Sequence, residues 1–196
     1  MGNCIFLIVG CSGSGKTTIT EQLEQKYKLK SIQSYTTRQP RYDGETGHTF
    51  ISIEEFDKLT DICAYSELAG NRYCATAEQV ENNDLYVIDP NGIDYFIKSY
   101  NGKKTPKIIF IDSDLSTRYD RMVKRAEDKE DAFLTAVDKA LSRIKNDVVE
   151  FYDYTHNNAH VDCIVKNNKN DNLNQVVDKI YNYICDCERR WVYIWR

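Results

Sequence analysis

A glycine-rich stretch near the N-terminus has the residue types and the spacing of a phosphate-binding loop. The sequence GCSGSGKT, residues 10–17, matches the pattern G-x-x-x-x-G-K-[ST] in full. Glycine permits backbone conformations that turn successive N–H groups toward phosphate oxygens. Lys16 would reach the β- and γ-phosphates of a nucleoside triphosphate, and the Thr17 hydroxyl would bind Mg²⁺. The residues predicted to surround the phosphates are Gly10, Ser12, Gly13, Ser14, Gly15, Lys16, Thr17 and Thr18.

The elements on either side place this loop in an α/β fold. Ile5–Val9 has the pattern of a buried strand that enters the loop, and Thr18–Lys28 that of the helix that follows it. Further apolar runs predict buried parallel strands at 85–88, 108–111 and 163–165, with helices expected at 92–100, at 116–125 and from 173 past 184. Strands that alternate with helices predict a parallel sheet flanked by helices.

The longest helical pattern spans Asp131–Tyr154. Its apolar residues recur at spacings of three and four along the chain: Phe133, Val137, Ala140, Leu141, Ile144, Val148 and Phe151. Such a stripe predicts a helix whose apolar face packs into the core.

A carboxylate stands at the end of the second predicted strand. Asp89 follows Leu85–Ile88 directly. Open α/β sheets bind ligands at the carboxyl ends of their strands, and an aspartate there can hold Mg²⁺ through water. The alternative is an aspartate that caps the next helix or closes a turn.

Residues 33–82 interrupt the alternation of strands and helices with a polar insertion. It begins with SYTTRQPR, residues 34–41, in which Arg38 and Arg41 are three positions apart. Arginine suits a second phosphoryl group, because its planar fork donates paired hydrogen bonds and keeps its charge. Further on, ICAYSELAGNRYCAT predicts short strands around a Gly-Asn turn. The insertion therefore predicts an acceptor-phosphate site, with a solvated turn as the alternative.

Together these motifs resemble the guanylate kinase family over about residues 4–184. The resemblance rests on the phosphate loop, on SYTTRQPR against S-x-T-T-R-x-P-R, on GNRY against G-N-x-Y-G, on Asp89, and on VDCIVKNN against a late strand that ends in Asn. It implies a three-part P-loop kinase. The parts would be a core (1–32, 83–125 and 141–184), an inserted monophosphate-binding domain (33–82) and a short lid (126–140), followed by a tail (185–196).

The resemblance also implies roles for single residues. The residues implied to hold the acceptor and its phosphate are Ser34, Arg38, Arg41, His48, Tyr73 and Asp89. Those implied in catalysis are Lys16, Arg38, Arg125 and Arg143, with Arg121 as a further arginine on the lid side. Asn167 or Asn168 would lie near adenine, and Thr17 and Asp89 would serve the metal. The charged run RAEDKED, residues 125–131, becomes a mobile lid segment in this interpretation, whereas its composition alone indicates a solvated loop.

The sequence departs from the family pattern mainly where guanine is read. Ala64 stands at the position of a base-reading glutamate, Ala75 at that of a Ser/Thr, and Val87 at that of the first of two aspartates. His48 or Phe50 takes the place of a phosphate-binding tyrosine. The phosphate-handling residues are thus kept and the base-reading residues are largely lost, so we expect weak base recognition. Alternatively Tyr65, Glu67 or Thr76 turns inward and reads a different base.

The leading functional hypothesis is ATP- and Mg²⁺-dependent phosphoryl transfer to a nucleoside monophosphate. GMP or dGMP is the first acceptor that we expect. The alternatives are another or a modified nucleotide, ribose 1,5-bisphosphate, and a non-catalytic binding module of the same family. The last is disfavoured because such modules typically lose the phosphate loop, whereas Lys16 and Thr17 are intact.

Composition and charge indicate which classes of partner and which cellular compartment to expect. A net charge of −4 argues against a protein that coats nucleic acid or anionic lipid. No apolar stretch approaches the length of a membrane span, and the apolar run at 4–10 lacks the flanks of a signal peptide. The odd count of seven cysteines, without paired CxxC spacing, predicts reduced thiols in a cytoplasmic protein. The oligomeric state stays open, and the aromatic tail is expected to dock onto something unidentified.

Overall fold

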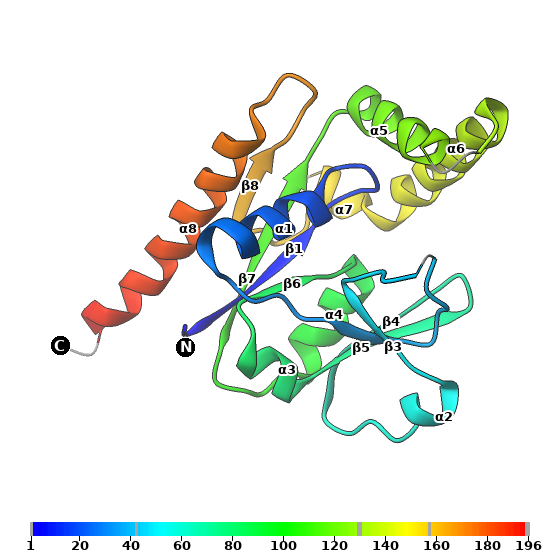
Figure 1. Ribbon diagram of the computed structural model, residues 1–196. Helices are drawn as coiled ribbons and strands as arrows, with labels where there is room; N and C mark the ends of the chain where they lie inside the picture. Colours follow the sequence, from blue (N-terminus) through cyan, green and yellow to red (C-terminus); the bar gives the residue numbers. More distant parts are fainter. Residues whose placement is uncertain (1, 42, 129–130, 157, 195–196) are drawn as a thin grey trace.

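A computed structural model describes residues 2–41, 43–128, 131–156 and 158–194, with side chains up to 189. Four parallel strands form its central sheet in the order β6-β1-β7-β8 (Figure 1). Their bounds are β1 Cys4–Val9, β6 Leu85–Val87, β7 Thr105–Asp112 and β8 Cys163–Lys166. These are the four strands that the apolar runs predicted, and the parallel α/β fold is confirmed.

The two faces of this sheet are covered by different helices. Side chains alternate across a strand, so Phe6 and Ile8 of β1 pack with α1 (Lys16–Tyr27) and α8 (Leu173–Ile194). Leu7 and Val9 pack on the other side, in a cluster that includes residues of α4 (Pro90–Ser99) and α7 (Tyr152–Thr155). The sheet is therefore buried on both faces, as near-continuous apolar strands require.

The insertion forms a second sheet in the order β3-β2-β5-β4. Its strands are β2 Ser34–Thr36, β3 His48–Phe50, β4 Ile62–Leu68 and β5 Asn71–Thr76. Two short helices, α2 (Ile53–Phe56) and α3 (Ala77–Asn82), each begin at a capping box, with Ser52 and Thr76 as the N-caps.

The hairpin between β4 and β5 turns one residue earlier than the sequence indicated. Leu68 pairs with Asn71, so Ala69 and Gly70 form the two-residue loop rather than Gly70 and Asn71. Both have positive φ, 50° and 75°. A two-residue loop of this hand matches the twist of the flanking strands, and that geometry decides the position of the turn.

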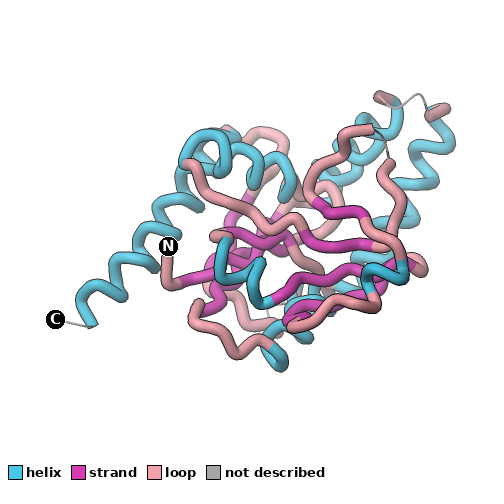
Figure 2. Tube along the Cα trace, turned by 60° about the horizontal axis from the view of Figure 1, so that its bottom comes forward, coloured by secondary structure: helices cyan, strands magenta, loops and turns pink. Residues whose placement is uncertain are grey.

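Two helices project from the central sheet at the upper right of Figure 1, α5 (Leu115–Glu127) and α6 (Phe133–Glu150). Asp114 caps α5 by accepting a hydrogen bond from the Thr117 N–H at 2.7 Å. Figure 2 shows this pair at one end of the molecule and the long C-terminal helix α8 at the other.

The predicted helix at 131–154 is divided, and three of the seven residues of its apolar stripe are exposed. The break lies at Phe151, between α6 and α7. Phe133, Leu141 and Val148 are exposed by 61%, 44% and 63%. The prediction of core packing was wrong for these residues, because α6 packs against α5 through a small cluster that includes Ala136 and Ala140 and is otherwise open to solvent.

Most described residues of the predicted lid (126–140) and of the predicted tail (185–196) are helical. Helix α5 runs through Glu127 and α6 begins at Phe133, so the expected loop at 125–131 is shorter than predicted. Residues 129–130 lie outside the described residues, and so do the side chains of the aromatic tail from 190 onward. Within the described part, no helix combines the length and the apolarity that a bilayer crossing requires.

Candidate active site

The phosphate loop lies between β1 and α1, at the carboxyl edge of the central sheet. Gly13 and Gly15 have φ of 78° and 95°, a region that only glycine adopts readily. A Cβ on Gly15 would also lie only 2.5 Å from the Asn167 amide nitrogen, which is too close for a side chain. Helix α1 starts without a side-chain cap. Within the described residues the buried Ser14 hydroxyl has no hydrogen-bond partner. A helix start without a side-chain cap and an unpartnered hydroxyl fit a bound phosphate.

Lys16 is folded back over its own loop. Its Nζ donates to the carbonyl of Gly10 and, at 3.1 Å, to that of Cys11. Burial lowers the pKa of Lys16 to about 8, while the nearby Asp147 carboxylate acts in the opposite direction. A triphosphate would supply the negative charge that this ammonium group needs.

The far side of the loop is tied to β8. The Asn167 amide donates to the Ser14 carbonyl at 2.8 Å, and Arg121 Nη1 donates to the Asn167 carbonyl at 3.0 Å. Asn168 accepts from the Asp114 N–H at 2.9 Å. Arg121 therefore braces the loop instead of lining the cleft, and contact of either asparagine with adenine stays a prediction.

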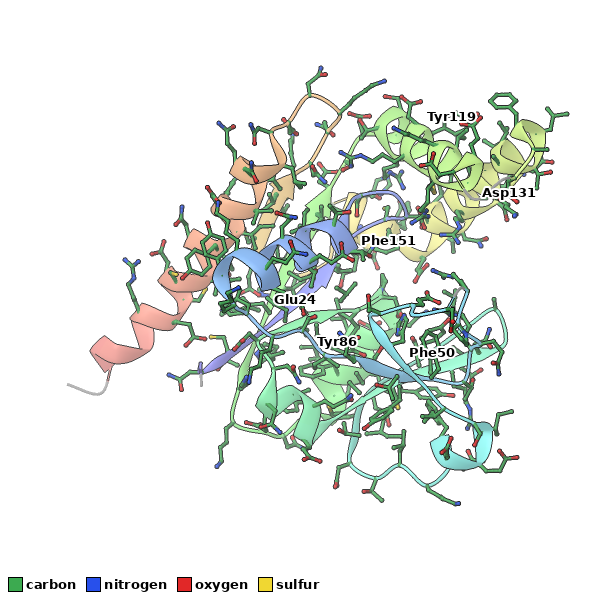
Figure 3. The ribbon with its side chains drawn as sticks, in the orientation of Figure 1. Glu24, Phe50, Tyr86, Tyr119, Asp131 and Phe151 are labelled. Atoms are coloured by element: carbon green, nitrogen blue, oxygen red, sulfur yellow. The ribbon has the colours of Figure 1, made fainter. Side chains whose placement is uncertain are left out.

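A cleft of about 890 Å³ opens beside the loop (Figure 3). Thr17 and Thr18 of α1 line it from the core, Arg41 and His48 from the insertion, and Arg125 and Arg143 from α5 and α6. In Figure 3 the labelled Glu24 and Asp131, which also line the cleft, mark two of its sides. Residues far apart in the sequence thus face one space, as the predicted phosphoryl-transfer site requires.

The arginines in this cleft interact electrostatically with one another. Partial desolvation lowers the pKa of Arg125, with the positive charges of Arg143 and Arg41 acting in the same direction. Desolvation and the charge of Arg41 likewise lower the pKa of Arg143. Arg41 Nη1 lies 3.6 Å from the Glu45 carboxylate, which offsets part of its charge. The converging positive charges of Arg125 and Arg143 favour a bound polyanion.

On the acceptor side, Arg38 is held by a residue that the sequence reasoning missed. Its guanidinium pairs with Glu45 at 3.1 and 3.0 Å, and the two side chains are only 12% and 6% exposed. Glu45 also accepts from the Arg41 N–H at 2.6 Å. Arg38 Nε is buried without a partner among the described residues, and Arg41 is largely exposed. The position of Glu45 in the turn after the arginine motif was the only signal of this role.

Strand register places three of the predicted acceptor residues, Ser34, His48 and Tyr73, on one face of the second sheet. Ser34 pairs with His48, Ser66 with Tyr73, and Ala64 with Ala75. Because side chains alternate, these six residues share one face, the one that carries His48 to the cleft.

The two candidates for the family's tyrosine position, His48 and Phe50, make different contacts. His48 Nδ1 lies 2.9 Å from the Ser34 hydroxyl, and its ring lies 5.6 Å from that of Tyr73. Phe50 instead lies under the Arg38 guanidinium at 5.2 Å, where it supports that side chain. His48 is therefore the side chain that presents a polar atom beside Ser34.

Two of the three positions that depart from the family's base-reading pattern are closed. Ala64 and Ala75 have no exposed surface and pack in a core cluster that includes Tyr86 and Ile88. Val87 is only partly buried and lines the cleft. Of the alternative base readers, Thr76 caps α3, and the Tyr65 hydroxyl donates to Glu67.

Asp89 shows the capping role that the sequence analysis kept as the alternative to a metal site. One carboxylate oxygen accepts from the Gly92 N–H at 2.7 Å, at the start of α4, and the other from the Ser66 hydroxyl at 2.6 Å. Each oxygen thus accepts one hydrogen bond and keeps a free lone pair, so the capping role is compatible with the predicted water-mediated role toward Mg²⁺. Thr17, exposed at the cleft, fits a direct ligand.

A phosphate loop at the edge of a doubly covered parallel sheet, with arginines from an insertion and a helical pair across the cleft, defines the class of P-loop phosphotransferases. A family model described as "Guanylate kinase" matches residues 3–176. The chain belongs to the guanylate kinase family, and it is a nucleoside monophosphate kinase that uses ATP and Mg²⁺.

Individual relatives agree with this membership. The chain is similar to a guanylate kinase of Bartonella henselae, 30% identical over 199 residues that cover 95% of this chain and 82% of that protein. A guanylate kinase of Clostridium tetani is 27% identical over 192 residues, which cover 92% and 84%. The crystal structure of guanylate kinase from Anaplasma phagocytophilum matches with a TM-score of 0.54 at 18% identity, over 96% of this chain and 88% of that one, and supports the fold.

Proposed function

We propose that this kinase transfers the γ-phosphoryl group of ATP to the phosphate of GMP or dGMP, with weaker discrimination between bases than an intact guanine site provides. One observation carries the proposal. Arg41 from the insertion, Arg125 from α5 and Arg143 from α6 converge on the cleft that Thr17 lines. Their charge would neutralise the transferring phosphoryl group, and no covalent intermediate is needed.

Each part of the cleft takes one task. Lys16 would neutralise charge on the β- and γ-phosphates, and Thr17 would hold the Mg²⁺ that bridges them. Arg38, whose terminal nitrogens are held by Glu45, would offer its unpartnered Nε to the acceptor phosphate, together with Arg41, His48 and Tyr73. The proposed domain division follows from these tasks: residues 33–82 bind the acceptor, 126–140 cover the cleft, and the remainder up to 184 forms the core.

The closed base side favours a second candidate acceptor. A site that reads guanine needs hydrogen-bonding groups, and the methyl groups of Ala64 and Ala75 offer none. Another nucleotide, a modified base or ribose 1,5-bisphosphate would lose little there, because the phosphate contacts do not depend on the base. The odd number of cysteines without paired CxxC spacing supports a reducing compartment, so we propose that the reaction takes place in the cytoplasm.

A panel of acceptors tests this proposal. ADP release from Mg·ATP is measured with GMP, dGMP, AMP, CMP, UMP and ribose 1,5-bisphosphate. We expect GMP or dGMP to react fastest, with a preference over AMP well below about ten-thousandfold, the level of an intact hydrogen-bonding site. A larger preference would show that guanine is read by other residues. Lys16→Ala is the catalytic control, and we expect it to be folded and at least about a hundredfold slower.

A further inference from the structure

One buried carboxylate beside the phosphate loop has no place in the reaction described so far. Asp147, on α6, is 5% exposed. Its oxygens accept hydrogen bonds from the Ser12 N–H at 2.9 Å, from the Ser12 hydroxyl at 3.0 Å and from Arg118 Nη1 at 2.9 Å. A charge buried this far is retained only when it is fully paired, and these three donors provide that pairing.

Through these contacts Asp147 fixes the first half of the loop. Ser12 is the third residue of the glycine-rich stretch, and both its N–H and its hydroxyl are directed to α6. The second half is tied separately, by Asn167 at the Ser14 carbonyl. The loop is therefore held from two sides, by α6 and by β8, without any contribution from a bound nucleotide.

The same contacts help to place α6. Its apolar cluster, Met122, Val123, Ala136 and Ala140, joins it to α5, and Phe151 at its C-terminal end packs in the main core. Asp147 adds a polar link from α6 to the phosphate loop. Arg143 precedes Asp147 by four residues, so the two lie one above the other on the same side of the helix. The helix that is tied to Ser12 therefore also carries Arg143, which lines the same cleft as Thr17.

We propose that Asp147 is a positioning residue for phosphoryl transfer, which acts through Ser12 and α6 to set the place of Arg143 relative to the γ-phosphate. The inference rests on the role proposed above for Arg143. It also explains the presence of Arg118, since the Arg118–Asp147 pair links α5 to α6 at the point where both meet the loop. Displacement of a reacting-centre contact by about 1 Å can cost about a hundredfold in rate, so a tether of this kind is kinetically important.

The test compares Asp147→Asn, Arg143→Ala and the double variant, with Asp138→Asn as a matched control. Asp138 is an exposed carboxylate on the same helix. With the best acceptor, we expect Asp147→Asn to lower kcat about tenfold and to change the KM of the acceptor less than threefold, with little further loss in the Arg143→Ala background. Asp138→Asn should match the wild type. Additive losses, or a normal kcat in folded Asp147→Asn, would overturn the inference.

A binding measurement separates this inference from the identity of the acceptor. Calorimetric titration with Mg·ATP and with Mg·ADP needs no acceptor and reports contacts to the γ-phosphate. We expect Asp147→Asn and Arg143→Ala each to reduce the preference for ATP by about tenfold, and not additively. Tighter ATP binding by Asp147→Asn would mean that the carboxylate competes with phosphate, and an unchanged preference would mean that it only stabilises the fold. Either result overturns the inference, even if the acceptor panel identifies no substrate.

If Asp147→Asn fails to fold, Ser12→Ala takes its place. It removes the hydroxyl contact and leaves both the Ser12 N–H contact and the Arg118–Asp147 pair. We then expect the same loss of γ-phosphate preference at about a third of the size. A normal preference in this variant would count against the tether.

Discussion

The phosphate side and the base side of the cleft are built in opposite ways. On the phosphate side, polar and charged groups are held by hydrogen bonds within the protein: Arg38 by Glu45, Ser12 by Asp147 and the Ser14 carbonyl by Asn167. On the base side, Ala64 and Ala75 are fully buried among apolar side chains. The difference teaches that phosphate and base recognition depend on different parts of the structure, and under the proposed function this chain keeps the first and weakens the second.

Replacing Arg38 or Arg41 by alanine should have the largest effect on kcat/KM, and it tests whether the phosphate side binds the acceptor. We expect Arg38→Ala and Arg41→Ala each to cost about 2–4 kcal/mol in kcat/KM, because a charge-assisted phosphate contact is lost. Arg38→Ala should also lower the free energy of unfolding, since it leaves Glu45 buried without its main partner. Arg41→Ala should not, because that side chain is largely exposed.

Steady-state kinetics and chemical denaturation measure the two quantities for each variant. A double variant, Arg38→Ala with Glu45→Gln, should recover stability but not activity. If it recovers activity as well, Arg38 acts on the fold and not on the acceptor phosphate, and the phosphate side loses this pre-organised contact.

A glutamate at position 64 tests whether the base side is packed, as its lack of exposed surface indicates, or is an open pocket. We expect Ala64→Glu to lower the free energy of unfolding by about 2–3 kcal/mol, because a polar side chain enters a site with no exposed surface. Leu68→Glu is the control on the same strand, where the side chain is 53% exposed, and should change stability by less than about 0.5 kcal/mol. Denaturation curves measure the free energy of unfolding of both variants. A stable Ala64→Glu protein with a raised preference for GMP would contradict a packed base side.

The smallest expected effect concerns the charge of Lys16. Its pKa is lowered to about 8 by burial in the loop, so the native state binds fewer protons than the unfolded state between about pH 8 and the ordinary lysine range. Stability should therefore rise with pH in this window, as the cost of burying the ammonium group is relieved. We expect the difference in unfolding free energy between wild type and Lys16→Met to change by about 1 kcal/mol from pH 8 to pH 9. Saturating Mg·ATP should remove this dependence, and a difference that is flat with pH would show that Lys16 keeps its charge without a phosphate.

Local chemistry explains how much of this protein could be predicted. The glycine loop, the four strands of the central sheet and α1, α4, α5 and α8 follow from patterns that span about ten residues each. The hairpin turn and the break at Phe151 could not be placed, because both depend on how neighbouring strands and helices fit together. The exposed part of the apolar stripe of α6 was misjudged for a similar reason. Periodicity reports that a helix has an apolar face, but not what covers it.

By itself the sequence determined the class of chemistry. Glycines with positive φ, a lysine and a threonine at fixed spacing act through their own backbone and side chains, so their order along the chain is sufficient. Only the tertiary structure decided that Asp89 caps α4 with both oxygens engaged, that His48 rather than Phe50 meets Ser34, and that Glu45 and Asp147 hold the site together. Ser12 and Asp147 are 135 positions apart, and a single carboxylate on a helix has the same local pattern whether it is solvated or buried. Its environment, which gives it a function, exists only once the chain has folded.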